Sequence, residues 1–162
     1  MENVQPVRRA EVTFRPATAE DCRFVAAHLR EADRREVLAS GFRSSLAALE
    51  TSFHGSDVVF AGLIDGEVSM IFGVGAPIFA DAGTVWALGT DNLTRHPREM
   101  LIHGRAKVRE LLEQFPAMEN YCDARYTAAH RWLKRIGFTL SDPVPHGPHG
   151  EPFVKIMIRK ET

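Results

Sequence analysis

The sequence predicts one α/β domain arranged around a central sheet. The chain has 162 residues, the length of one ordinary domain that can bury a core of its own. Segments with strand-like alternation and segments with helical spacing follow one another along it. In the second half, the order strand–helix–strand requires a parallel crossover connection within the sheet.

Start and stop signals delimit these elements. Thr18 precedes acidic residues, as a helix N-cap does. Asp65 and Gly66 lie between two apolar runs, the pattern of a tight hairpin. Pro97 suits the first turn of the longest helix, and Gly104 within it indicates close contact with the sheet. The expected strands cover residues 12–15, 58–63, 68–74, 84–90, 118–123, 138–140 and 153–158, and the expected helices cover about 19–29, 31–38, 44–53, 97–115 and 126–136.

Composition narrows the class of function. The formal net charge is −1 and the pI is about 6.7, so no global basic field favours nucleic acid or a membrane as partner. No apolar run is long enough to span a bilayer. Polar residues 1–10 are expected to form a flexible arm before a domain over residues 11–162, and they contain no hydrophobic signal core. Cys22 and Cys122 are expected as buried free thiols in a cytoplasmic protein, with a disulfide as the alternative.

The order of elements and three local motifs resemble the GNAT superfamily of N-acetyltransferases. The motifs are the opening strand and helix cap over residues 12–21, the hairpin at 65–66, and the late segment 128–138. The resemblance covers about residues 11–160. It implies a mixed, mostly antiparallel sheet with helices on both faces and a splay between strands four and five.

A narrower resemblance is to small GNAT-like proteins of tailed phages, which include the small internal virion protein of short-tailed phages. It rests on the long helix and on residues 86–91, 120–124 and 131–138. The match implies a phage or prophage product with an acetyltransferase-like fold.

The GNAT resemblance implies acetyl-CoA as cofactor. Backbone groups of Leu88 and Thr90 would meet its pantetheine arm at the splay. The family's glycine-rich diphosphate loop corresponds to residues 92–98, which contain no glycine and include Pro97, a residue without an N–H donor. Side chains would have to replace the backbone donors there, or the segment is an ordinary helix start with solvated charges. The candidates are Thr94, Arg95, His96 and Arg98.

Proton handling is the second requirement of this chemistry. The family tyrosine that protonates the departing thiolate aligns with Leu133, so Tyr126 is the candidate acid, with core packing as the alternative role. Asp91 and Glu67 are the candidate bases. The alternative role is the start of a turn for Asp91 and a solvated surface charge for Glu67. The histidine pair at 146 and 149 lacks a third ligand, so no metal is expected.

The sequence therefore predicts an acetyl-CoA-dependent N-acetyltransferase, or a diverged acyl-CoA-binding relative, acting on an amine of a small molecule or protein. The alternative is an inactive GNAT scaffold that serves a phage as a structural or accessory virion protein. The expected location is the cytoplasm or the virion, and the expected partners are an amine acceptor, virion proteins or a second copy in a homodimer.

Overall fold

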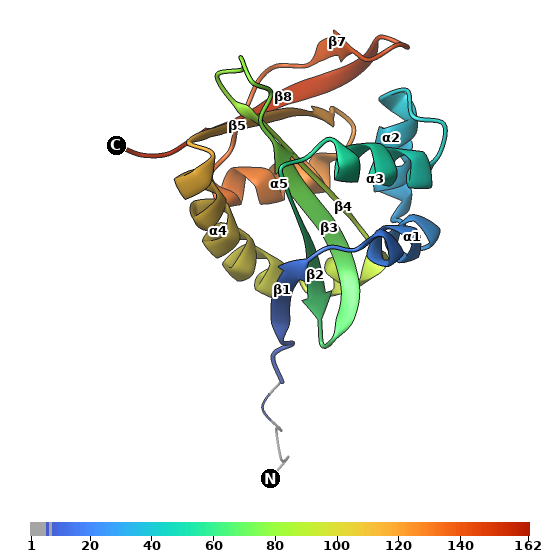
Figure 1. Ribbon diagram of the computed structural model, residues 1–162, viewed down its shortest axis with the longest axis vertical. Coiled ribbons are helices and arrows are strands. Elements are labelled where there is room, and N and C mark those ends of the chain that lie inside the picture. The colour runs from blue at the N-terminus through green and yellow to red at the C-terminus, as the bar shows by residue number, and fades with distance from the viewer. Residues whose placement is uncertain (1–5, 7) are drawn as a thin grey trace.

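A twisted sheet crosses the centre of the computed structural model, which describes residue 6 and residues 8–162 (Figure 1). The strand order is β1-β2-β3-β4-β5-β8-β6, and β7 pairs with β8. Every pair is antiparallel except β4–β5. The elements are β1 (Val12–Pro16), α1 (Ala19–Ala27), α2 (Glu31–Ala39), α3 (Ser45–His54), β2 (Val58–Ile64), β3 (Glu67–Gly75), β4 (Gly83–Gly89), the 3₁₀ helix η1 (Asp91–Arg95), α4 (Pro97–Gln114), β5 (Ala117–Asp123), α5 (Thr127–Ile136), β6 (Thr139–Leu140), β7 (Val144–His146) and β8 (Glu151–Arg159).

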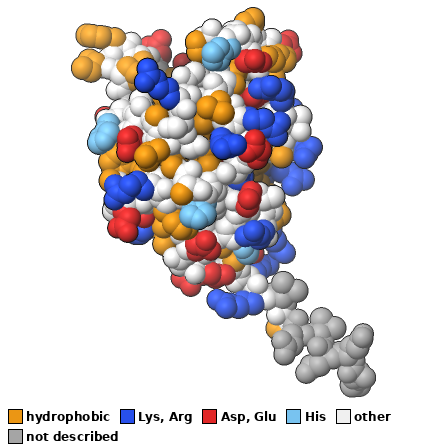
Figure 2. Space-filling view, turned by 90° about the vertical axis from the view of Figure 1, so that its right-hand side faces the viewer, with side chains coloured by type: hydrophobic (Ala, Val, Ile, Leu, Met, Phe, Trp, Pro, Cys, Tyr) orange, Lys and Arg blue, Asp and Glu red, His pale blue; other side chains and the backbone are white. Residues whose placement is uncertain are grey.

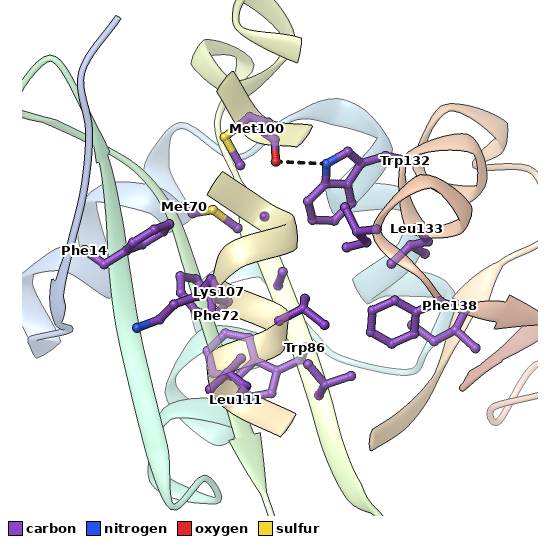
Figure 3. A pocket seen from close by; sticks show the side chains of 16 residues that line it. Phe14, Met70, Phe72, Trp86, Met100, Lys107, Leu111, Trp132, Leu133 and Phe138 are labelled. Atoms are coloured by element: carbon purple, nitrogen blue, oxygen red, sulfur yellow. Dashed lines mark hydrogen bonds between the residues drawn. The ribbon is translucent and has the colours of Figure 1, made fainter. Parts of the chain in front are cut away.

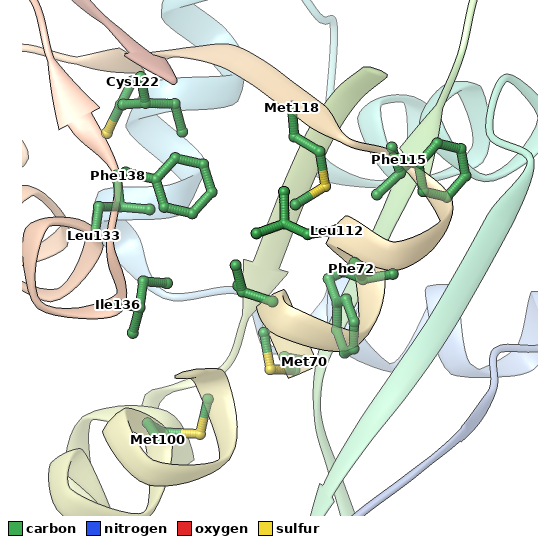
Figure 4. Packing of buried hydrophobic residues seen from close by; sticks show 14 of the residues in the cluster. Met70, Phe72, Met100, Leu112, Phe115, Met118, Cys122, Leu133, Ile136 and Phe138 are labelled. Carbon is green, nitrogen blue, oxygen red and sulfur yellow. The ribbon is translucent and has the colours of Figure 1, made fainter. Parts of the chain in front are cut away.

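Helices cover both faces of the sheet, as predicted. Successive strand residues point to opposite faces, so Ile71 joins a core under α1–α3 while Phe72 joins a core under α4 and α5. In the second core, Met118 from β5 lies near Leu112 from α4, and Leu133 and Phe138 close the other end (Figure 4). The mixed, mostly antiparallel α/β architecture is confirmed.

The local signals in the sequence correspond to the structures that they predict. Thr18 and Asp21 form a reciprocal capping box, in which the Thr18 side chain accepts from the Asp21 N–H at 3.2 Å. Arg15 pairs with the Asp21 carboxylate at 2.6 Å and lowers the pKa of that group. Asp65 and Gly66 both have positive φ, 48° and 81°, which a tight hairpin of this type requires.

Three local features differ from the predictions. The short helix η1 before α4, which Thr90 caps, was not predicted. β7 was missed because its proline and the surrounding Pro/Gly residues are typical of a loop. It pairs with β8, and its His146 ring stacks on the Tyr121 ring of β5 with 3.8 Å between ring centres. Gly104 does not approach the sheet. A Cβ there would lie 3.0 Å from the Trp132 ring, so its close contact is with α5.

The described chain shows no helix long and apolar enough to cross a membrane. Cys22 and Cys122 are both buried and free, as expected. Acidic and basic side chains lie interspersed over much of the face in Figure 2.

Candidate active site

The parallel pair β4–β5 is joined over a short stretch only. Its register covers Gly83 with Met118 and Thr84 with Glu119, and no further rungs follow. β4 continues to Gly89 and β5 to Asp123. The two strands therefore part toward their carboxyl ends, which confirms the predicted splay and gives a place where backbone groups lack a strand partner.

The alternation of hydrogen bonds decides which residues of β4 face the splay. Thr90 donates its N–H to Ser69 O of β3 at 2.9 Å. Hydrogen-bonded pairs alternate along an antiparallel ladder, so Leu88 and Thr90 direct their backbone groups to β3. Ala87 and Gly89 direct theirs to the splay. The backbone groups of Leu88 and Thr90, which were predicted to face the splay, therefore face β3 instead.

Two of the three splay-facing positions of β4 are already occupied. The side-chain amide of Asn120 donates to Val85 O at 2.6 Å. Gly89 O accepts from the Arg30 N–H at 2.9 Å, and Gly89 N–H donates to the Asp33 carboxylate at 2.8 Å. Among the described residues, no hydrogen bond is made to the backbone N–H or C=O of Ala87 on this side. The backbone of Ala87 is therefore open to a ligand, whereas Val85 and Gly89 on either side are already bonded.

Helix α2 bridges the mouth of the splay with two carboxylates, Asp33 and Glu36, which we call the α2 clasp. Asp33 binds β4 through Gly89. Glu36 lies one helical turn further on and accepts from the Asp123 N–H of β5 at 3.0 Å and from the Cys122 thiol at 3.4 Å. The clasp holds the two diverging strands at a fixed separation.

Burial and like charge perturb the groups around the clasp. Burial, with Asp33 nearby, raises the pKa of Glu36 to about 7. Burial and the Asp33 carboxylate raise the pKa of Tyr126, so its phenol stays protonated at neutral pH. Burial and Glu36 likewise raise the pKa of Cys122. Arg30 balances one negative charge, because it pairs with Asp33 at 3.0 Å and lies 5.8 Å from the centre of the Tyr126 ring.

An apolar cavity of about 90 Å³ lies on the face of the sheet opposite α2, under α4 and α5 (Figure 3). Val85 and Ala87 form its wall at the splay. Trp132 closes the gap between the two helices, donating its ring N–H to Met100 O at 3.3 Å. The lining residues are Phe14, Met70, Phe72, Val85, Trp86, Ala87, Met100, Gly104, Lys107, Val108, Leu111, Trp132, Leu133, Ile136, Phe138 and Ile156.

The predicted acid and bases are not brought together. Tyr126 immediately precedes α5 and lies beside the clasp. Asp91 and Glu67 are exposed, at the end of the molecule where η1 follows β4. Neither side chain has a hydrogen bond or ion pair with a described residue, Tyr126 included. Their catalytic roles stay predictions.

The segment predicted to hold the cofactor phosphates presents its cations to solvent. Thr94, Arg95 and Arg98 are exposed and His96 is half-buried. Neither arginine forms an ion pair with any residue that the structure describes. No side chain caps the start of α4. In the same described part of the chain, no three His, Cys, Asp or Glu side chains are placed to hold a metal ion.

Solved structures of acetyltransferases share this fold. A GNAT-family acetyltransferase from Bacillus anthracis matches with a TM-score of 0.67 and 11% identity, covering 95% of this chain and 98% of that one. The ribosomal-protein-S18-alanine N-acetyltransferase from Escherichia coli matches with a TM-score of 0.63 and 11% identity, covering 94% and 96%. Mycobacterium smegmatis RimJ in complex with CoA-disulfide matches with a TM-score of 0.65 and 14% identity, covering 93% and 84%.

These likenesses establish the GNAT fold for this chain, in agreement with the β4–β5 splay. No protein-family model matches the sequence, and no curated protein matches it. The relationship to phage proteins that the sequence resemblance implies stays a prediction.

Proposed function

We propose that the protein is an acyl-CoA-dependent N-acyltransferase whose reaction centre is the β4–β5 splay. The observation that carries the proposal is the open backbone position at Ala87, which lies between the bound positions Val85 and Gly89. An apolar cavity adjoins it on one face of the sheet. Groups with perturbed pKa adjoin it at the mouth of the splay. This combination is typical of a binding and reaction site.

The chain's own groups fit an acyl-CoA thioester at this place. The N–H and C=O of Ala87 match an amide group such as those of a pantetheine arm, in the manner of an added strand. Arg95 and Arg98 supply positive charge for phosphates without a glycine-rich loop, with Thr94 and His96 as further donors. When bound, the thioester supplies the activated acyl group.

We assign the proton transfers to Glu36 and Tyr126. A carboxylate with a pKa near 7 can accept a proton from an ammonium or amine at neutral pH. As the amine nitrogen bonds to the acyl carbon and the carbon–sulfur bond breaks, the protonated phenol of Tyr126 donates to the departing sulfur. The carboxylates of the α2 clasp also favour a cationic amine as acceptor. Asp91 and Glu67, the bases that the sequence suggested, are the alternatives to Glu36 in this role.

Thermal unfolding with and without acetyl-CoA tests the proposal. A ligand at about one hundred times its Kd adds about 2.7 kcal/mol of stability, and each kcal/mol raises the Tm by about 2–4 °C in a domain of this size. The double variant Arg95→Ala/Arg98→Ala should weaken binding several-fold. Arg109→Ala/Arg131→Ala removes two other exposed cations and should leave it unchanged. No rise at millimolar ligand refutes the proposal.

Two observations favour the inactive scaffold as second candidate. The α2 clasp already binds Gly89, and Trp132 closes the gap between α4 and α5. A scaffold of this kind would serve as a phage structural or accessory protein, as the narrower sequence resemblance implies. If the protein is such a scaffold, we expect it to bind no acetyl-CoA and to form a stable complex with virion proteins.

A further inference from the structure

The cavity under α4 and α5 is a half-open apolar space of about 90 Å³ beside the core. Concave apolar spaces of this kind are typical places for a small ligand group to bind. Its lining side chains are apolar except for Lys107. The Lys107 ammonium lies 3.9 Å from the centre of the Phe60 ring and pairs with Glu110 at 2.9 Å, so its charge is already satisfied. The cavity therefore suits an apolar occupant.

The walls of the cavity can adjust to such an occupant. Met70 and Met100 are unbranched and flexible, and side chains of this kind fill irregular space. Trp132 is held over Gly104 by one hydrogen bond of 3.3 Å. Because Gly104 has no side chain, the Trp132 ring can lie directly on α4.

The cavity is continuous with the proposed reaction centre. Val85 and Ala87 belong both to its wall and to the splay-facing edge of β4. A chain attached to a carbonyl at Ala87 can therefore extend between the sheet and α4. A dry cavity of about 150 Å³ holds benzene, so this smaller volume corresponds to about four aliphatic carbons.

Given the proposed acyltransferase function, on which this inference rests, we infer that the cavity binds the aliphatic part of the transferred acyl group. The acyl donor is then a short-chain thioester of about four carbons rather than acetyl-CoA. A succinyl group of similar length does not fit, because its carboxylate would be buried without a partner.

Binding of acetyl-, butyryl-, octanoyl- and succinyl-CoA to the full chain, measured by calorimetry, tests this inference. Each further buried methylene contributes about 0.8 kcal/mol, so butyryl-CoA should bind about tenfold or more tightly than acetyl-CoA. Octanoyl- and succinyl-CoA should bind more weakly than butyryl-CoA. Equal affinity for acetyl- and butyryl-CoA would overturn the inference and leave the proposed function intact. If none of the thioesters binds, both fall.

Two substitutions at Val108, which lines the cavity from α4, provide a second readout. Val108→Phe fills the space and should abolish the preference for butyryl-CoA over acetyl-CoA. Val108→Ala enlarges it and should shift the preference toward octanoyl-CoA. The ratio of affinities is compared within each variant, so a general loss of stability does not imitate the effect. Should Val108→Phe fail to fold, Val108→Ala still decides: an unchanged chain-length preference contradicts the inference.

Discussion

Replacing Glu36 by glutamine should make the protein more stable at alkaline pH and remove part of its pH dependence. The folded state raises the pKa of Glu36 from 4.5 to about 7. Each tenfold change in proton affinity is worth about 1.4 kcal/mol, so this difference corresponds to about 3 kcal/mol. In the Glu36→Gln variant, the amide oxygen of the new side chain can still accept from the Asp123 N–H and the Cys122 thiol.

The sign follows from where the proton is bound. The pKa is higher in the folded state, so between about pH 4.5 and 7 the folded protein holds a proton that the unfolded chain has lost. The contribution of Glu36 to stability is complete below pH 4.5 and is lost as the pH rises through 7. Above that pH, the wild type carries the full cost of a buried carboxylate, and Glu36→Gln does not.

Urea unfolding of both proteins between pH 4.5 and 8.5 gives the measurement. We expect similar free energies of unfolding near pH 4.5 and an advantage for Glu36→Gln of up to about 3 kcal/mol at pH 8. Glu50→Gln, at an exposed site on α3, is the matched control and should follow the wild type throughout. A constant difference between wild type and Glu36→Gln at every pH would refute the reasoning. Under the proposed function, the stabilised variant should also lose acyl transfer.

Three further predictions concern the core, the hydrogen bond from Asn120 to β4, and a helix cap. Leu133→Ala should lower the free energy of unfolding by about 2–5 kcal/mol in urea, since Leu133 is 9% exposed; a near-zero effect would place this face of α5 outside the core. Asn120→Ala should cost about 1–3 kcal/mol by leaving Val85 O without its partner, and an unaltered midpoint would show that water replaces the amide. Asp21→Asn should destabilise at pH 7. Because Arg15 lowers the pKa of Asp21, the contribution of this carboxylate is present above pH 3.8 and is lost as the pH falls, so the two proteins should converge in acid; parallel pH profiles would contradict this.

The elements of the fold were predictable because their signals are local. A cap such as Thr18, a hairpin pair such as Asp65-Gly66 and a left-handed stop such as Gly137 act within a few residues. The exceptions depend on distant partners. β7 forms a strand because β8 offers it a free edge, and Gly104 is needed because Trp132 lies against it.

The candidate site was predicted only in part. Tyr126 was singled out and does lie beside the clasp, whereas Asp33 and Glu36 were not singled out. On helix α2 they stand among several charged residues, and nothing in their spacing separates them from a solvated face. A pKa is perturbed by what surrounds a group in space, which the order of residues does not reveal.

The sequence by itself determined the order of strands and helices apart from η1 and β7, the parallel crossover and the absence of glycine before α4. These depend on residue type and spacing along the chain. Tertiary structure alone decided that Gly89 is bound and Ala87 open, that Glu36 reaches β5, and that a cavity remains beneath Trp132. Contacts between segments far apart in the chain set all three. They decide which strand residues point their backbone groups to a neighbouring strand, which carboxylates are buried, and how side chains fit together.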